Sequence, residues 1–367
     1  MAEPVNKLKN PLFQRGEYCD EKGRLYFYDN AKFVLIFLVV FGHAISVFRS
    51  EHPNYMVLWA VINTLHMPCF IFVSGFFAKR YLKGPNGINV QRVFSYVLLY
   101  LSAQLAVTLF ERLVLHADFS ISIFQARSSL WFLQCLVGWF ILLPIVDKFN
   151  PKYVLAGAVL FGLIIGYDSK VGDLAALSRM FVHFPFFMTG YYFTELNIKK
   201  LFARKARILA VFFIATTVGL CYVFLKYIQP DLITCNNSYV SIAGIKDLPV
   251  YIRFVGRAIF YFFAAGLGLS FLALTPRFKT FYTRFGARTL QVYILHRFIF
   301  LAYSQYEWFK PFDTFWGRIA MLFISIAITF ILSLKVFAIP FEALQNIKIP
   351  KFALKKVLEV KENQAVL

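Results

Sequence analysis

About ten apolar runs, each near the length of a membrane-spanning helix, follow one another along this chain of 367 residues. A helix needs about 20 consecutive apolar residues to cross the hydrocarbon core of a bilayer. The runs lie at about 33–49, 56–80, 92–115, 130–149, 153–168, 179–197, 206–228, 252–274, 289–308 and 315–340. They predict an all-α fold: a polytopic membrane helix bundle of about ten transmembrane helices.

The composition agrees with a bilayer as the solvent. Hydrophobic residues make up 59% of the chain and charged residues 16%, whereas soluble domains are about 25% charged. The net charge of +20 would suggest nucleic acid in a soluble protein. Here the cations lie in short loops between apolar runs, so we expect membrane lipids and no nucleic acid as partners.

The cations predict the orientation of the chain. They cluster before residue 25, near 79–92, 148–152, 199–207 and 277–288, and again after 347, which are alternate loops of the predicted bundle. The positive-inside rule then places both termini in the cytoplasm. We divide the chain into a cytoplasmic segment 1–28, a transmembrane domain 29–341 and a cytoplasmic tail 342–367. The polar N-terminal segment is unlike a cleavable signal peptide, so the first run is expected to remain as a signal-anchor.

The five cysteines show no CxxC or other metal-ligand spacing. We therefore expect neither a metal site nor a disulfide framework.

Asp29 precedes an apolar run, and we expect it to pair with Lys32 or to cap the first helix. His43 is an unexpected residue near the end of this run. Lys32 precedes it by eleven residues, which is about 20° beyond three helical turns, so both side chains share one helix face. The rise of roughly 16 Å places His43 near the bilayer midplane. An ionisable residue at that depth usually faces the bundle interior or a wet cavity. The plainer alternative is a histidine that hydrogen-bonds a neighbouring helix.

The second run repeats this arrangement in the stretch "HMPCFIFVSGFFAKR", from His66 to Arg80. These two residues are about 40° short of four turns apart and share a face, while Lys79 points away. Pro68 is a candidate kink, and Gly75 permits close approach of a neighbouring helix. Two mid-membrane imidazoles above cations predict a cavity open to the cytoplasm, whose mouth would suit a phosphorylated cofactor.

A third imidazole, His296, lies in "FGARTLQVYILHRFI", about two turns from the cytoplasmic end of its run. Tyr293 precedes it by one turn on the same side of the predicted helix.

These residues resemble a known family. Lys32 and His43 fit its hallmark of a basic residue, ten residues and a histidine. The stretches "LHMPCFIFVSGFFAKR", "LWFLQCL", "HFPFFMTGYYF" and "FGARTLQVYILHRF" resemble its later blocks, in the same order. The chain is identified as a member of the acyltransferase 3 superfamily of integral membrane O-acyltransferases, most similar to its fucose 4-O-acetylase-like branch. It departs from some members in having "AKRYLK" where they have RxxR.

The resemblance implies a reaction and a location. It implies acetyl-CoA as a cytosolic donor, a sugar hydroxyl of a surface polysaccharide or lipid-linked glycan as acceptor, and a bacterial plasma membrane. A neutral His43 could serve as general base, or could carry the acyl group covalently. Glu111 is a candidate to orient it, although pairing with Arg112, Arg253 or Arg257 is the simpler alternative.

Further roles follow from the resemblance and from charge. Arg80 and then Lys32 are candidates for the CoA phosphates, because a guanidinium fits phosphate bidentately; a plain positive-inside role is the alternative. His66, Tyr293 and His296 are assigned to the cofactor side. Trp131, Arg127 and Ser128 are assigned to the acceptor side, with Trp131 as a sugar platform or else an aromatic-belt residue.

Two other functions remain open from the sequence alone. A transporter or flippase could use mid-membrane histidines as a proton relay. A non-catalytic component of a polysaccharide assembly complex is the other alternative.

Overall fold

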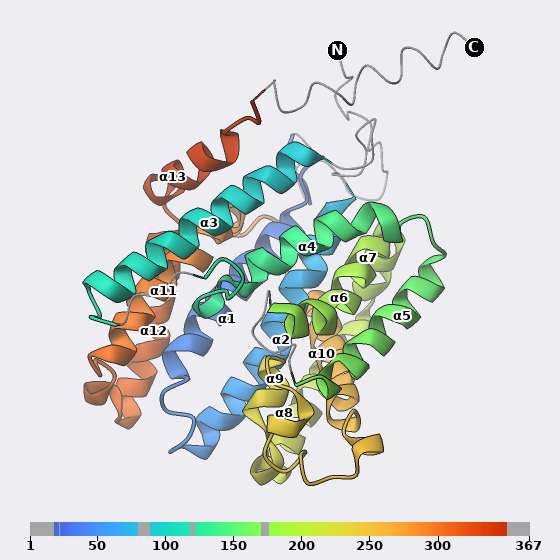
Figure 1. Cartoon of the computed structure of the whole chain (residues 1–367), viewed down its shortest axis with the longest axis vertical. Coiled ribbons are helices and arrows are strands. Elements are labelled where there is room, and N and C mark those ends of the chain that lie inside the picture. Colours follow the sequence, from blue (N-terminus) through green and yellow to red (C-terminus); the bar gives the residue numbers. More distant parts are fainter. Residues whose placement is uncertain (1–17, 22, 80–88, 118–121, 170–175, 351–367) are drawn as a thin grey trace.

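The computed structural model describes residues 18–21, 23–79, 89–117, 122–169 and 176–350. Within these ranges the chain is helical, and an isolated β-bridge joins Cys19 to Leu25. The α-helices are α1 Tyr26–Ile45, α2 Pro53–Ala78, α3 Val90–Leu113, α4 Trp131–Val146, α5 Pro151–Ile164, α6 Leu177–Tyr192, α7 Glu195–Leu201, α8 Arg204–Val223, α9 Pro230–Thr234, α10 Val255–Leu274, α11 Thr289–Gln305, α12 Phe315–Leu332 and α13 Lys335–Asn346 (Figure 1). The all-α prediction is confirmed.

The helices that follow the predicted runs differ in length. Six of them are long and apolar enough to cross a membrane, namely α1, α2, α3, α8, α10 with the short turn before it, and α12. Helices α4, α5, α6 and α11 are shorter. The chain is therefore a multi-pass membrane protein by its helices, whereas about ten spans and cytoplasmic termini stay predictions.

Two of the predicted runs are each interrupted by a break in the helix. At both breaks a side chain from another part of the chain donates hydrogen bonds to backbone carbonyls. The run 315–340 divides into α12 and α13, because the Gln291 amide on α11 donates to the carbonyls of Leu332 and Leu334 at 2.6 and 2.8 Å. The run 179–197 ends as a helix at Tyr192. There the Lys79 ammonium donates to the Phe193 carbonyl at 2.5 Å, and Thr194 caps the start of α7.

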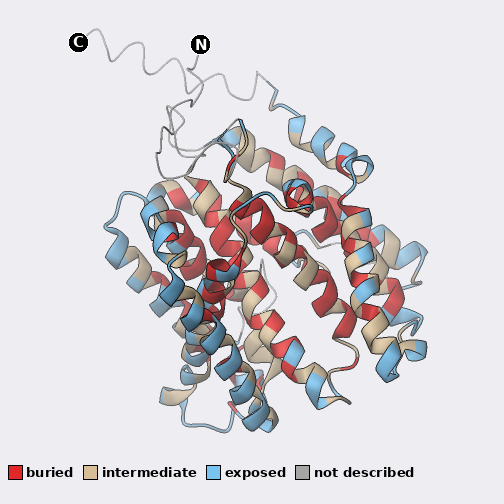
Figure 2. Cartoon of the chain, turned by 180° about the vertical axis from the view of Figure 1, so that it is seen from behind, coloured by how far each residue is buried: buried red, intermediate tan, exposed pale blue. Residues whose placement is uncertain are grey.

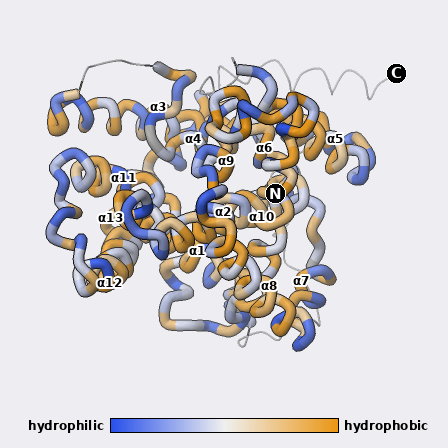
Figure 3. Tube along the Cα trace, turned by 90° about the horizontal axis from the view of Figure 1, so that it is seen from below, coloured by the Kyte–Doolittle hydropathy of each residue, from blue (hydrophilic) through white to orange (hydrophobic). Residues whose placement is uncertain are grey.

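Helices α1 and α2 form the centre of the bundle (Figure 1). Helix α1 packs against α2, α11, α12 and the short 3₁₀ helix η7 (Thr283–Arg288), while α2 packs against α6 and α10. The most apolar stretch of α1 is 72% buried, compared with 11% for α8. Figure 2 shows the buried residues concentrated in the central helices. Figure 3 shows that the peripheral α8 is nevertheless largely hydrophobic, as expected of a helix that faces lipid.

Glycines bring α2 and α6 into backbone contact. A Cβ atom on Gly75 would lie 2.0 Å from the Phe187 carbonyl oxygen, and one on Gly190 would lie 1.9 Å from that of Phe72. The two contacts are reciprocal, so neither helix tolerates a side chain at the crossing. The prediction that Gly75 permits close approach is confirmed. Pro68 lies inside α2, which continues through it to Ala78.

Candidate active site

The half-buried His43 ring on α1 faces α11, not the outside of the bundle. Its centroid lies 5.2 Å from that of His296, and Phe300 lies beyond at 6.5 Å. The Arg297 guanidinium donates to Nδ1 of His43 at 3.1 Å. Two imidazoles and a guanidinium from two helices therefore meet at one point inside an apolar bundle, where ionisable groups usually serve function.

The hydrogen bonds assign the protons of these rings. Arginine can only donate, so Nδ1 of a neutral His43 is the acceptor and its proton lies on Nε2. His296 has the opposite tautomer, because its Nδ1 is 2.8 Å from the Val292 carbonyl, which can only accept. Nε2 of His296 is buried and has no hydrogen-bond partner in the described part of the chain. His43 therefore has a donor nitrogen and His296 an acceptor nitrogen, on rings whose centroids lie 5.2 Å apart.

His66 and His183 extend this cluster onto α2 and α6. Each donates from Nδ1 to a carbonyl four residues earlier, His66 to Ile62 at 2.7 Å and His183 to Arg179 at 3.0 Å. Both therefore present the acceptor nitrogen Nε2 to the interior. His66 is close enough to His43, His183 and His296 to interact electrostatically with each of them.

Trp131, at the start of α4, packs against this cluster from the other side. Its ring lies 5.2 Å from His183, and the Arg179 guanidinium stacks over it at 5.1 Å. Trp131 is 9% exposed, so the alternative of an aromatic-belt residue at the lipid surface is wrong. The sugar-platform assignment stays a prediction.

Tyr293 is buried one turn before His296, at a ring distance of 6.3 Å. Its hydroxyl donates to the Ser129 carbonyl and so ties α11 to the 3₁₀ turn η1, Ser128–Leu130. Ser128 belongs to the same turn, but its side chain lies outside the described residues. Tyr293 therefore lies beside the imidazoles, and the binding roles of Tyr293 and Ser128 stay predictions.

Glu111, near the end of α3, forms an ion pair with Arg127. The suggested pairings of Glu111 with Arg112, Arg253 and Arg257 are wrong, because all three guanidiniums donate to backbone carbonyls instead. Arg112 donates to Ala117, Arg253 to Lys246 and Leu248, and Arg257 to Gly162 and Asn237. Glu111 is an electrostatic neighbour of Arg297, which in turn holds His43. The carboxylate is therefore placed to act on His43 through Arg297.

The charged residues at the start of α1 are already paired. Asp29 accepts from the Arg24 guanidinium at 2.6 and 2.7 Å and lies 2.9 Å from the Lys32 ammonium. The predicted Asp29–Lys32 pair is confirmed, and the hydrogen bond with Asp29 raises the pKa of Arg24. Lys32 also lies 5.6 Å from the centroid of the Phe77 ring on α2. Arg80, the other predicted phosphate ligand, lies outside the described residues.

The comparisons with known proteins decide the family. The family model described as an acyltransferase domain (acyltransferase 3) matches residues 25–334. The chain belongs to this acyltransferase family. No curated protein and no solved structure is significantly similar to it. The match runs from just before α1 to the end of α12, so all four clustered imidazoles of this acyltransferase belong to the matched domain.

One group of described residues in the acyltransferase has spacing suitable for a metal ion: Glu51, His52 and Asp313, at the surface. The Arg318 guanidinium already donates to Asp313 at 2.7 Å and lies 3.1 Å from Nε2 of His52. The hydrogen bond from His52, with that from Arg318, lowers the pKa of Asp313. A cation already fills this group, which fits a structural contact between loops better than a metal centre.

Sequence reasoning missed Arg297 and His183, which the structure of the acyltransferase places in the cluster. Both were visible as ionisable residues inside apolar runs, and Arg297 directly follows the predicted His296. The sequence predicted an open cavity at His43. A cavity of about 370 Å³ lies instead between Arg207 and Arg277.

Proposed function

We propose that this membrane acyltransferase transfers an acetyl group from acetyl-CoA to a sugar hydroxyl of a surface polysaccharide or lipid-linked glycan. The fucose 4-O-acetylase-like branch and a bacterial plasma membrane belong to the same proposal. The observation that carries it is the contact of His43 with His296 and Arg297 inside a domain of the acyltransferase family. Acyl transfer to an alcohol needs a base for the hydroxyl proton and a positive group near the carbonyl oxygen, and this contact contains both.

In the general-base route an imidazole of the His43–His296 pair takes the proton of the acceptor hydroxyl. The alkoxide oxygen forms a bond to the thioester carbonyl, and the carbon–sulfur bond then breaks. CoA leaves as a thiolate, which takes the proton back from the imidazole. Nε2 of His296 already has its lone pair free, whereas Nδ1 of His43 is occupied by Arg297. His43 would act as the base only after Arg297 releases Nδ1, or after the ring proton moves from Nε2 to Nδ1 and leaves Nε2 free.

In the covalent route a nitrogen of His43 attacks the thioester carbonyl carbon, the carbon–sulfur bond breaks, and CoA leaves as a thiolate that takes up the proton lost by the imidazole. The acceptor hydroxyl then attacks the acyl-imidazole, the nitrogen–carbon bond breaks, and the proton of the hydroxyl returns to the ring. This route separates donor and acceptor in time, so the acyl group could pass toward the opposite face of the membrane. Because Nδ1 of His43 is held by Arg297, the attacking nitrogen would be Nε2 after loss of its proton to a neighbour. Nε2 of His296 is the acceptor suited to that proton.

The donor and acceptor would meet the imidazoles from different sides. We assign the CoA phosphates to Arg80 and Lys32, since Lys32 lies at the beginning of α1, three turns before His43. We assign the acceptor to the side of Trp131, Arg127 and Ser128, because the Trp131 ring contacts the His183 ring at a centroid distance of 5.2 Å. Glu111 holds Arg127 on that side.

The experiment uses purified full-length protein, acetyl-CoA labelled in the acetyl group and a panel of sugar acceptors. We expect label on an acceptor, and we expect His43→Ala and His296→Ala each to lower turnover by about 100-fold or more. His116→Asn is the matched control, because His116 is exposed and has a positive φ of 55° that asparagine tolerates. Label retained on wild-type protein but not on His43→Ala would select the covalent route.

The proposal fails if wild-type protein transfers no label, or if His43→Ala turns over acetyl-CoA as fast as His116→Asn does. Proton-coupled uptake by protein reconstituted in liposomes, without acetyl transfer, would instead favour the transporter alternative.

A further inference from the structure

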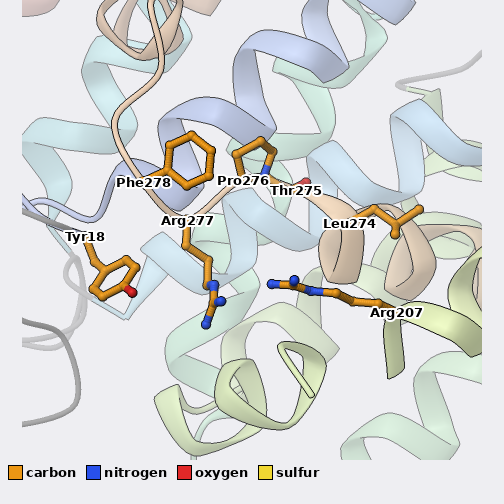
Figure 4. Close-up of a pocket in the computed structure, with 7 residues that line it drawn as sticks. All are labelled: Tyr18, Arg207, Leu274, Thr275, Pro276, Arg277 and Phe278. Carbon is orange, nitrogen blue, oxygen red and sulfur yellow. The ribbon is translucent and has the colours of Figure 1, made fainter. Parts of the chain in front are cut away.

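Two arginines, one on α8 and one in the loop after α10, converge on a pocket. The pocket has a volume of about 370 Å³ and is lined by Tyr18, Arg207, Leu274, Thr275, Pro276, Arg277 and Phe278. Figure 4 shows the guanidinium of Arg207, from α8, and that of Arg277, from the loop after α10, reaching into the same space. No acidic residue is among those that line it, so two like charges face one another without a counter-ion.

The side chains of these two arginines have no acidic partner among the residues that the structure describes. Neither forms an ion pair or a side-chain hydrogen bond with another residue in the described ranges, and Nε of Arg207 is buried without an acceptor. The Arg277 guanidinium is held by aromatic rings instead, 4.7 Å from the centroid of Phe202 and 5.7 Å from that of Tyr18. The cation–π contacts fix its position and leave its N–H donors available for an anion.

The start of α8 adds positive potential to the same place. Its cap residue, Ala203, offers no side-chain hydrogen bond, and the first turn holds no acidic residue. The first turn instead carries Arg204, Lys205 and Arg207, although cations are unfavourable at the positive end of a helix dipole. An anion in the pocket would offset both the dipole and the crowded charges.

The loop that carries Arg277 is rigidly anchored. Asn30, fully buried on α1, donates to the carbonyls of Pro276 and Phe278, each at 2.9 Å. Its side-chain oxygen accepts from the hydroxyls of Thr280 and Thr283. The loop backbone is therefore positioned before any ligand arrives, which lowers the entropy cost of binding.

The pocket adjoins exposed apolar surface. Val211, one turn after Arg207 on nearly the same face of α8, is 57% exposed, and Leu274 in the pocket lining is 41% exposed. Within the pocket lining, Phe278 is 57% exposed. Cations at the edge of a lipid-facing apolar surface match a ligand that has an anionic head and apolar tails.

We propose that the Arg207–Arg277 pocket binds the phosphate of an anionic phospholipid. Two guanidiniums supply bidentate, charge-assisted hydrogen bonds to the phosphate oxygens. The acyl chains lie along the exposed apolar side chains of Val211, Leu274 and Phe278. The site is separate from the proposed acetyl transfer and does not depend on it.

Native mass spectrometry of the full chain in detergent tests this site. Phosphatidylglycerol, phosphatidylcholine, inorganic phosphate and CoA are titrated separately into wild type, Arg207→Gln, Arg277→Gln and Arg284→Gln. Arg284 is the matched control, since it is exposed on the neighbouring η7 and does not line the pocket. We expect the wild type to prefer phosphatidylglycerol over phosphatidylcholine. Each pocket variant should weaken phosphatidylglycerol binding about tenfold, whereas Arg284→Gln should bind as the wild type does.

Several results would overturn the proposal. Equal weakening by Arg284→Gln would show a general charge effect, and equal binding of phosphatidylcholine would remove the need for an anionic head. Arginine-dependent binding of inorganic phosphate or CoA without phosphatidylglycerol binding would assign the pocket to a soluble ligand. If a glutamine variant does not fold, Arg207→Lys and Arg277→Lys retain the charge but lose the fork. In that case phosphatidylglycerol should raise the unfolding midpoint of the lysine variants less than that of the wild type. An equal rise in the lysine variants and the wild type would contradict the site.

Discussion

At the scale of single residues, Arg297 decides how His43 can react. The guanidinium occupies Nδ1 at 3.1 Å and so leaves the proton of the neutral ring on Nε2, toward the cluster. His296 complements it with a free Nε2 because its own proton is held by Val292. A pair of imidazoles in opposite tautomers can pass a proton from one ring to the other, which a lone histidine cannot do.

We expect Arg297→Gln to lower kcat by about 100-fold with a small change in KM, because a preorganised charged donor acts mainly in the transition state. Arg297→Lys should recover part of the loss, since an ammonium also donates to Nδ1 but lacks the planar fork. Steady-state kinetics on labelled acetyl-CoA measure both values. Arg288→Gln is the control, because Arg288 directly precedes α11 and bonds to the Ser333 carbonyl at 3.5 Å, away from His43. Equal losses of kcat in the two glutamine variants would reduce Arg297 to a structural role.

At the scale of helices, the crossing of α2 and α6 places His66 and His183 in one cluster. Gly75 and Gly190 allow the two backbones to touch, and the side chains around the crossing then interlock. The imidazoles lie on the same helices, nine residues before Gly75 and seven before Gly190. A wider crossing would therefore move the two rings apart as well as weaken the packing.

We expect Gly75→Ala and Gly190→Ala each to destabilise the protein by about 1–3 kcal/mol or more, because the new methyl group meets a backbone carbonyl that cannot move freely. Gly219→Ala on α8 is the matched control, since a Cβ atom there would meet nothing within 4 Å. The midpoint of thermal unfolding in detergent, followed by tryptophan fluorescence, measures the difference. A midpoint for Gly75→Ala as high as that for Gly219→Ala would contradict the close crossing.

At the scale of the whole molecule, contacts between distant loops close the bundle opposite the start of α1. His52, just before α2, bonds to Asp313 at 2.8 Å, and Arg318 on α12 bonds to the same carboxylate. These residues connect the second helix to the last long helix of the matched domain. The lowered pKa of Asp313 reports that connection.

We expect Asp313→Asn to lower the unfolding midpoint at pH 7, where the carboxylate is ionised and paired. A carboxyl with a lowered folded-state pKa contributes stability above its ordinary pKa of about 4 and loses it as the pH falls through the folded value. The difference between wild type and Asp313→Asn should therefore shrink as the pH falls below the ordinary pKa of an aspartate and through the lowered pKa of Asp313. Asp247→Asn, at an exposed carboxyl, serves as the control. A difference that stays constant with pH would show that the charge of Asp313 is not responsible.

The sequence by itself determined the class of the protein, because hydrophobic length and periodicity are local properties of the chain. The apolar runs predicted the helices, and the histidines within them pointed to the interior of the bundle. Their order with the surrounding motifs pointed to the acyltransferase family, which the domain match confirmed. The Asp29–Lys32 pair and the close approach at Gly75 were also predictable, since each depends on neighbours along one helix.

Only the tertiary structure decided which residues meet across helices. The partners of Glu111, the interior position of Trp131 and the break between α12 and α13 all depend on side chains more than ten residues away. The hydrogen bond from Arg297 to His43 joins residues that are 254 positions apart in the sequence. Helical periodicity defines a face but not the helix that packs against it, because packing minimises the free energy of all helices together. For that reason the reactive tautomers and the arginine pocket became visible only in the folded bundle.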